Sequence, residues 1–310
     1  MAEYYMPRQG SSYLENIVTW IRTGKRFRPR FPRAVQFQTL STCNAKCVFC
    51  CHSSEPKAIP HGRMDDGLIS KIIKECGRSG VGRVSPYMTN EPLMDKRMPR
   101  ILADIKKHSI LPVKTRITTN ASLLTPEIGE ALINAKLTQI WISVNGYSEE
   151  TYRQSMSLDF ARTMENIDRF LDLKRKMGAK HPKVNITTLR TRLVEHELED
   201  ARKYWDQRDV KFHIHAVDNR VGEETFDSVC VDTLERKKKR HCDLFLKQAY
   251  IVENGDMIIC CHDWKQSVVV GNIANSSIRE VWNSERFMKL IYEYFEGNFE
   301  NLEICRKCGC

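Results

Sequence analysis

The sequence has no run of apolar residues long enough to cross a bilayer, which takes about 20 of them. Its first residues, MAEYYMPRQG, also lack the charged-then-apolar pattern of a secretory signal. These two absences argue against a membrane protein and favour a cytoplasmic one. Without a secretory signal, and in a chain of 310 residues, a disulfide framework is not expected for the 12 cysteines. Metal binding is therefore the favoured use of these cysteines.

Internal repeats and low-complexity segments are also absent, which argues against a repeat protein. Hydrophobic residues make up 41% and charged residues 28% of the chain, as in ordinary globular proteins. The net charge of +10 is partly concentrated at 22–33, which read RTGKRFRPRFPR. A basic run with interleaved aromatics binds phosphate or nucleic acid in some proteins, and the alternative is a solvated linker. A second basic run at 235–241 is interpreted as a solvated helix end.

Three cysteines, Cys43, Cys47 and Cys50, lie in a Cys-x₃-Cys-x₂-Cys arrangement directly after the apolar alternation at 34–40. The loop carries no fourth cysteine, although His52 is a candidate fourth ligand for zinc. A structural zinc site closes its tetrahedron with four protein ligands, whereas a catalytic centre keeps one position open. Three thiolates on a four-iron cluster would likewise leave one iron open to a reacting molecule.

Strand-like and helix-like segments alternate after this loop, which predicts βαβ crossovers and a parallel sheet. The expected strands are 34–40, 83–88, 113–119, 139–144, 183–189 and 210–217, and the expected helices are 12–22, 67–77, 95–108, 125–136, 159–177 and 195–207. Asp65 and Asp66 are expected to cap the second of these helices, and Gly77 and Gly80 to end it. Six units are fewer than the eight of a closed barrel, so a partial (β/α)₆ TIM-like barrel or an open sheet is expected.

The pattern changes beyond Gly222. Residues 249–260 predict a hairpin with Asn254-Gly255 at its turn, and a helix is expected over 277–295. We therefore expect three parts, which are an N-terminal helix and basic linker at 1–33, an α/β core at 34–222 and a small hairpin-plus-helix domain at 223–310.

The cysteine loop, with aromatic Phe49 before its last cysteine, resembles the defining motif of radical SAM enzymes, and the resemblance covers about 34–222. It implies that the three cysteines hold a four-iron four-sulfur cluster whose open iron is chelated by S-adenosylmethionine (SAM). Reduction then yields a 5′-deoxyadenosyl radical that abstracts a hydrogen atom from the substrate. The protein orients the cofactor and excludes water.

The same resemblance implies further cofactor contacts. Residues 89–92, Thr-Asn-Glu-Pro, stand where the family has Gly-Gly-Glu-Pro, so Glu91 is implied to receive the methionyl ammonium with Thr89 and Asn90 beside it. The other implied contacts are Phe49, Thr119, Asn120, Ser143, Asn145 and, for the methionyl carboxylate, Arg153. The chain departs from the family pattern where two glycines are replaced by Thr89 and Asn90, and where an aspartate is commoner than Asn145.

A second set of cysteines is C-terminal and comprises Cys242, Cys260, Cys305 and Cys308. By itself it indicates a zinc-ribbon-like structural site. Beside the first motif it resembles the SPASM or twitch extension of radical SAM enzymes, which implies one auxiliary four-iron four-sulfur cluster with four ligands. Cys310 is an alternative to Cys308 as a ligand.

Candidates for contact with the substrate are Cys261, which follows a predicted cluster ligand, and four residues around the last strand, His213, His215, Asn219 and Arg220. A thiol at Cys261 would donate a hydrogen atom in an epimerisation, and the alternative is a packing residue beside the cluster. His213 and His215 alternate along a strand and so share a face, although core histidines with satisfied partners are an equal alternative.

The leading hypothesis is a radical SAM oxidoreductase or epimerase acting on a carbinol carbon of a sugar, aminocyclitol or aminoglycoside in natural-product biosynthesis. Its expected partners are a small-molecule substrate and a flavodoxin- or ferredoxin-type electron donor, with no membrane and no nucleic acid. A peptide-modifying maturase is the first alternative, disfavoured because residues 1–33 are too short for a leader-binding module. A basic, zinc-binding nucleic-acid protein is the second.

Overall fold

The computed structural model describes residues 4–5, 26–27, 29–54, 61–217, 229–231, 242 and 244–308. Several of the sequence predictions lie wholly or partly outside the described residues. They are the helix over 12–22, part of the basic run at 22–33, the basic run at 235–241, and the positions Asn219, Arg220 and Cys310. Within the described part of the chain, no helix is long and apolar enough to cross a membrane.

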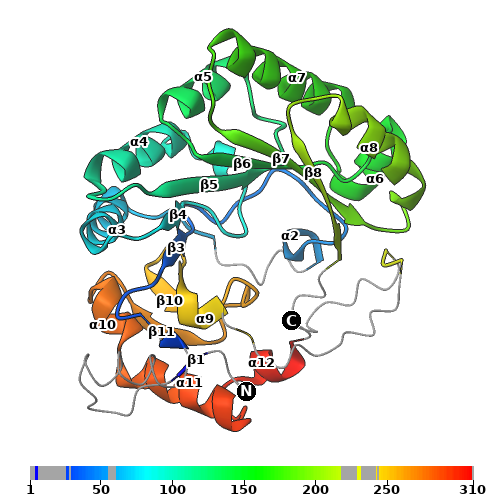
Figure 1. The fold of residues 1–310 in the computed structure, drawn as a ribbon. Coiled ribbons are helices and arrows are strands. Elements are labelled where there is room, and N and C mark those ends of the chain that lie inside the picture. Colours follow the sequence, from blue (N-terminus) through cyan, green and yellow to red (C-terminus); the bar gives the residue numbers. More distant parts are fainter. Residues whose placement is uncertain are drawn as a thin grey trace.

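Six parallel strands form the centre of the molecule and lie side by side in chain order (Figure 1). They are β3 (Ala34–Phe37), β4 (Arg83–Ser85), β5 (Lys114–Thr119), β6 (Gln139–Ser143), β7 (Lys183–Arg190) and β8 (Lys211–Ala216). The sheet does not close into a barrel, because β8 is its last strand on one side and the C-terminal strands continue it beyond β3 on the other. The predicted partial α/β barrel is confirmed.

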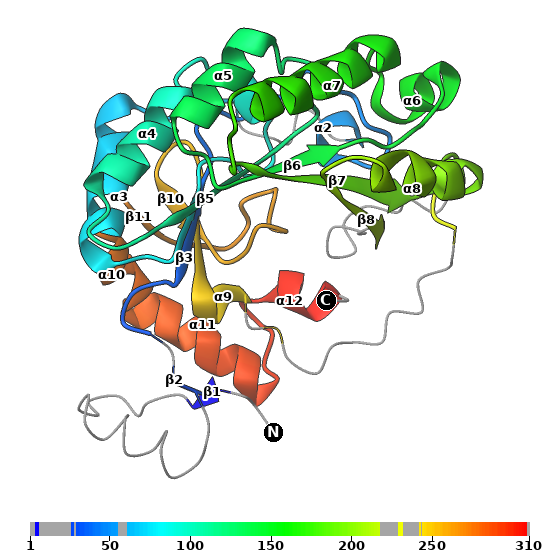
Figure 2. The same ribbon diagram turned by 45° about the horizontal axis from the view of Figure 1, so that its top comes forward.

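Helices cover one face of this sheet (Figures 1 and 2). They are α3 (Asp66–Ser79), α4 (Met98–His108), α5 (Pro126–Asn134), α6 (Glu149–Met156), α7 (Phe160–Lys176) and α8 (Leu198–Asp206). Three short helices, α2 (Cys51–Ser54), η2 (Pro92–Met94) and η3 (Glu195–Glu197), lie in the connections. Alternate strand residues such as Ile117, Ile140 and Ile186 are buried in one hydrophobic cluster under these helices. The other residues of each strand face away from the helices, toward the C-terminal elements.

Asp65 caps α3 as predicted, because its carboxylate accepts hydrogen bonds from the backbone N–H groups of Gly67 and Leu68. Gly80, with a φ of 66°, ends the helix in the left-handed conformation that glycine tolerates best. The prediction that Gly77 also ends the helix is wrong. Gly77 lies inside α3, where a side chain would collide with the backbone carbonyl of His108 at the end of α4.

The C-terminal part begins with α9 (Leu244–Lys247) and the predicted hairpin of β9 (Gln248–Ile251) and β10 (Asp256–Ile258), with Gly255 at φ 91° in its turn. Strand β11 (Val269–Asn272) pairs with β10, and β9 pairs in parallel with β3. The hairpin therefore extends the barrel sheet to nine strands in the order β11-β10-β9-β3-β4-β5-β6-β7-β8.

The single helix predicted over 277–295 is two helices, α10 (Ile278–Trp282) and α11 (Glu285–Glu296), followed by α12 (Glu303–Lys307). The break occurs because the Ser284 hydroxyl accepts a hydrogen bond from the N–H of Phe287 and starts a new helix. Near the N-terminus, β1 (Tyr4–Tyr5) and β2 (Arg26–Phe27) form a separate two-stranded parallel pair.

Candidate active site

The cysteine loop follows β3 at the edge of the sheet where the parallel strands end. Burial raises the pKa of Cys43 to about 11, and the negative charges of Glu91 and Cys50 add to this. The pKa of Cys47 is raised for the same reasons, by burial first and then by Cys50 and Cys43. The three thiols and one carboxyl group therefore share one partly buried site, whose thiols need a nearby positive charge, such as a metal centre, to ionise at neutral pH.

Glu91 is the acidic group of this site and is only 3% exposed. Its carboxylate accepts hydrogen bonds from the Thr119 hydroxyl at 2.6 Å, from the backbone N–H of Asn120 at 2.7 Å and from the backbone N–H of Leu93 at 3.0 Å. Burial raises its pKa to about 7 in spite of these donors. The carboxyl group is thus held rigidly at the ends of β4 and β5, where a bound cation would favour its charged form.

Asn120 ties the cysteine loop to β5. Its side-chain amide donates to Asn44 Oδ1 at 2.9 Å, and Asn44 Nδ2 donates to Ser122 Oγ at 2.8 Å. Asn44 lies between two of the cysteines and was not singled out from the sequence, since an asparagine in a loop is usually a turn former.

Thr89 and Asn90, which replace the two family glycines, are held from both sides. The backbone N–H and the hydroxyl of Thr89 donate to Gln38 Oε1 at 3.1 Å and 2.7 Å, and Gln38 Nε2 donates to Glu253 of the C-terminal hairpin at 2.9 Å. Asn90 Oδ1 accepts from the N–H of Met88 at 3.0 Å. Its Nδ2 is buried without a hydrogen-bond partner among the described residues. That orphaned donor is the feature expected where a polar cofactor is to bind.

The remaining predicted cofactor contacts have no described hydrogen bond to Glu91. Ser143 lies half-buried at the end of β6, and Phe49 is buried in the core cluster that also contains Tyr87. The Asn145 side chain bridges two elements, since its Oδ1 accepts from the N–H of Leu189 at 2.7 Å and its Nδ2 lies 3.6 Å from Met156 Sδ. Arg153 is exposed on α6, and no described contact links it to Glu91.

The C-terminal cysteines converge from three segments. Cys242, Cys260, Cys305 and Cys308 all pack against one hydrophobic core cluster. Burial raises the pKa of Cys305 to about 12, with a contribution from the charge of Cys242. Tyr294 of α11 accepts a hydrogen bond from the N–H of Cys242 at 2.6 Å, and burial, Cys242, Cys305 and Cys308 raise its pKa. Four thiols therefore surround one site beside α11.

Neither cysteine set has the geometry of a single-ion site. Among the described residues, no three side chains of His, Cys, Asp or Glu are close enough to hold one metal ion. A zinc ion needs four ligands within about 2.0–2.3 Å of its centre, whereas the cysteines of a four-iron cluster bind different irons and stand further apart.

Cys261 lies in the loop that follows β10, and it lines a small cavity together with Gln38, Thr89 and Trp264. Trp264 packs against Cys50 and Cys51, so this loop reaches from the C-terminal cysteines to the N-terminal cysteine loop. The structure thereby brings the predicted catalytic candidate beside a predicted cofactor contact. Trp264 was missed because no sequence motif marks it.

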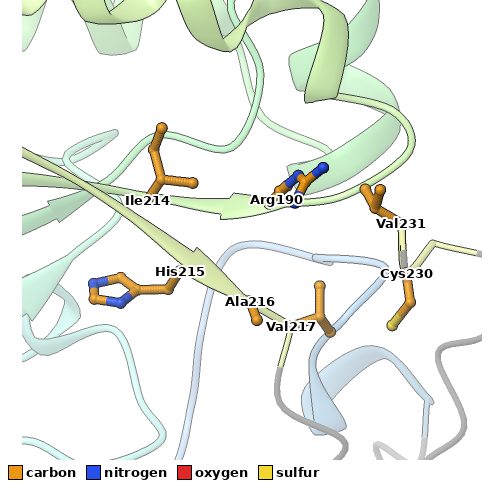
Figure 3. A pocket seen from close by; sticks show the side chains of 7 residues that line it. All are labelled: Arg190, Ile214, His215, Ala216, Val217, Cys230 and Val231. Atoms are coloured by element: carbon orange, nitrogen blue, oxygen red, sulfur yellow. The ribbon is translucent and has the colours of Figure 1, made fainter. Parts of the chain in front are cut away.

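His213 and His215 share a face of β8, as predicted, with their rings stacked at 6.1 Å. His213 Nε2 lies 3.1 Å from Asn185 Oδ1, and burial and the neighbouring His215 and Lys211 lower the pKa of His213. His215 and Val217 line a cavity of about 180 Å³ at the end of β8, with Cys230 across from them (Figure 3).

An open α/β barrel with a three-thiol loop and a separate four-thiol set is typical of an iron–sulfur enzyme. The sequence model of the radical SAM superfamily matches residues 38–204, and that of the SPASM iron–sulfur cluster-binding domain matches residues 242–309. The chain belongs to the radical SAM superfamily. It is a radical SAM enzyme whose cofactors are SAM and four-iron four-sulfur clusters, one in the barrel and one auxiliary.

Two curated relatives were compared. The S-adenosyl-L-methionine-dependent 2-deoxy-scyllo-inosamine dehydrogenase of Niallia circulans is 22% identical over 282 residues, which cover 89% of this chain and 92% of the relative. The AdoMet-dependent heme synthase of Methanosarcina barkeri is 26% identical over 140 residues, which cover 44% of this chain and 38% of the relative.

Solved structures show the same fold. BtrN in complex with AdoMet and 2-DOIA aligns with a TM-score of 0.59 at 16% identity, covering 89% of this chain and 92% of BtrN. Streptococcus suis SuiB bound to precursor peptide SuiA aligns with a TM-score of 0.69 at 14% identity, covering 93% of this chain and 74% of SuiB. At these identities the likeness extends to the fold and not to the substrate.

Proposed function

We propose that this enzyme removes a hydrogen atom from a carbinol carbon of a sugar, aminocyclitol or aminoglycoside and oxidises that carbon to a carbonyl. The support in sequence is the similarity to the Niallia circulans dehydrogenase along nearly the whole of both chains. The observation that carries the proposal is structural. The hairpin that leads into Cys260 is hydrogen-bonded to β3, which itself leads into the cysteine loop, so one continuous sheet carries the first cysteine set and Cys260 of the second.

The proposed division of labour follows from that sheet. Residues 34–222 would hold SAM and the first cluster through Cys43, Cys47 and Cys50, and residues 223–310 would hold the auxiliary cluster through Cys242, Cys260, Cys305 and Cys308. When bound, SAM and the first cluster together supply a hydrogen-atom acceptor, and the auxiliary cluster supplies a one-electron acceptor. These two acceptors match the two electrons that an alcohol loses when it becomes a carbonyl.

The chain's own residues would orient the cofactor and exclude water. The Glu91 carboxylate, fixed by Thr119 and Asn120, would receive the methionyl ammonium, and the orphaned amide of Asn90 would donate to another polar atom of SAM. Gln38 would hold Thr89 in place and link it to Glu253, so that the C-terminal part helps to shape the cofactor site.

A cytoplasmic flavodoxin or ferredoxin would supply the reducing electron. The test uses the anaerobically reconstituted enzyme with SAM, a reductant and candidate polyols deuterated at the carbinol carbon. Deuterium should appear in 5′-deoxyadenosine, with one carbonyl product formed for each SAM consumed. Absence of transfer from any sugar or aminocyclitol, together with transfer from a peptide, would overturn the proposal in favour of a maturase.

Epimerisation is a second candidate, favoured by the position of Cys261 beside Thr89 and Gln38. A thiol there would return a hydrogen atom to the substrate radical. In heavy water an epimerase places deuterium at the product carbon and fails when Cys261 is replaced by alanine. Oxidation to a carbonyl does neither, which separates the two reactions in one experiment.

A further inference from the structure

The face of the sheet that points away from the helices carries positive charge without negative charge. Strand register places Arg83 and Lys114 opposite each other on this face, followed by Arg116, and Lys211, His213 and His215 lie on the same face of β8. Over the described strands β3 to β9, no position on this face is Asp or Glu. A surface of one sign inside a site attracts ligands of the opposite sign.

Arg116 is held in a fixed orientation on this face. Its guanidinium lies over the ring of Trp141, 4.8 Å from the centroid, and its Nε donates to the Tyr87 hydroxyl at 3.1 Å. Trp141 in turn stacks on His213 with ring centroids 4.8 Å apart. This contact uses only Nε, which leaves the terminal nitrogens of Arg116 without a hydrogen-bond acceptor among the described residues.

Arg83 is the second half-buried guanidinium, and its Nη2 donates to Gln248 Oε1 at 2.6 Å. The two cations are near each other, because Arg116 lies two residues beyond Lys114, the register partner of Arg83. Burial lowers the pKa of Arg83, and the like charge of Arg116 lowers it further. Neither arginine forms an ion pair with any carboxylate of the described residues. Two neighbouring, partly desolvated cations without an anion are costly unless a ligand supplies one.

The carboxylate of SAM is a poor candidate for that anion. Arg116 precedes Asn120, at the cofactor end of β5, by four residues, which is about 13 Å along a strand. Arg83 likewise begins β4, whereas Glu91 follows its end. The neighbours of Arg83 instead include Tyr87 and Tyr250, and Tyr250 lies close to Cys260 and Cys261. The two arginines therefore lie on the side of the auxiliary cysteines.

We propose that Arg83 and Arg116 bind an oxyanion of the substrate, a phosphate monoester or a carboxylate, so that the enzyme selects a negatively charged sugar or polyol. This inference rests on the function proposed above. A planar guanidinium fits the oxygens of either group with two parallel hydrogen bonds. With the anion fixed near the start of β4 and β5, the rest of the molecule extends toward the cofactor end of the strands.

The test compares four hexoses of one scaffold and different charge, which are glucosamine, glucose, glucuronate and glucose 6-phosphate. Binding to the reconstituted, SAM-loaded full chain is measured by anaerobic calorimetry at constant ionic strength. At least one of the two anions should bind ten times or more tightly than glucose, and the anion that binds more tightly identifies the group. Equal or tighter binding of glucose or glucosamine, or no binding of either anion, would overturn the proposal.

Variants separate a binding role from a structural one. Arg83→Gln and Arg116→Gln should each weaken binding of the preferred anion at least tenfold and leave glucose unchanged, and Arg116→Lys should retain part of the affinity. The matched control is Arg169→Gln, because Arg169 is exposed on α7 and its one ion pair among the described residues is with Glu165. Equal anion affinity in all variants, with unchanged melting temperatures, would contradict the assignment.

The outcome is distinguishable from failure of the proposed function, because binding is measured without turnover. Anion binding without deuterium transfer would contradict the proposed oxidation and support the anion-binding site. If a neutral or cationic polyol is oxidised and Arg116→Gln does not change that activity, the proposed oxidation is supported and the anion-binding site is contradicted.

Discussion

The two cysteine sets differ in how the chain builds them. Cys43, Cys47 and Cys50 lie within eight residues of one loop, directly after one strand. Cys242, Cys260 and the pair Cys305 and Cys308 come from three segments that only the hairpin and α11 to α12 bring together. The first set is thus local and depends little on the rest of the fold, whereas the second depends on tertiary packing.

They also differ in what completes them. The first set has three thiols beside the buried carboxyl group of Glu91, and the second has four thiols packed against a hydrophobic core. Three protein ligands leave a coordination position for a reacting molecule, and four close the centre. The difference supports the proposal of chemistry at the first set and electron transfer at the second.

Loss of one cysteine from the first set is expected to have the largest effect. In Cys43→Ala the reductive cleavage of SAM should fall to background and the iron content by about four atoms, because the first cluster loses a ligand. Production of 5′-deoxyadenosine under dithionite measures the effect. Cys76→Ala is the control, since Cys76 is a buried core residue of α3. Retained 5′-deoxyadenosine in Cys43→Ala would contradict the division between the sets.

The corresponding change in the second set should separate the two activities. Cys305→Ala is expected to lose about four iron atoms and substrate oxidation while it cleaves SAM within about threefold of wild type. Iron and sulfide analysis and parallel assays of 5′-deoxyadenosine and carbonyl product provide the measurement. If SAM cleavage is lost as completely as oxidation, the second set supports the first structurally and the comparison fails.

Glu91→Gln probes what completes the first set. The amide keeps the shape but not the charge, so SAM should bind roughly 10- to 100-fold more weakly, the cost of a charged hydrogen bond of about 1.5–3 kcal/mol. Equilibrium binding of SAM to the reconstituted enzyme tests this. Glu127→Gln on the exposed start of α5 is the matched control. Unchanged affinity in Glu91→Gln would remove the carboxylate from the cofactor site.

The sequence predicted the fold around the local set more readily than the contacts between distant segments. The spacing of Cys43, Cys47 and Cys50 and the alternation of six strands led directly to the barrel and its loop. The contacts of Gln38 with Thr89 and Glu253 could not be predicted, because they join residues 51 and 215 positions apart. Asn145 shows the same limit, since its position is marked by a motif but its amide is engaged by Leu189 of the next strand. Propensity also missed the break at Ser284, because one capping hydrogen bond outweighs helical periodicity.

The smallest effect concerns the stability of the cluster-free protein. Burial raises the pKa of Glu91 from its ordinary value of 4.5 to about 7. Between these values the folded chain keeps a proton that the unfolded chain has released, so stability is greatest at low pH and falls as the pH rises through 7. The loss is about 3 kcal/mol at most, from 1.36 kcal/mol for each unit of pKa.

Urea unfolding of cluster-free wild type and Glu91→Gln from pH 5 to 8 isolates this contribution, because the histidines titrate equally in both proteins. The wild type should lose more stability than the variant over that range. If stability changes equally with pH in both proteins, the hydrogen bonds from Thr119, Asn120 and Leu93 already keep the Glu91 carboxylate charged without a bound cation. Replacing Cys305 of the second set should leave this pH dependence unchanged, because burial raises the pKa of this thiol to about 12 and keeps it protonated over the whole range.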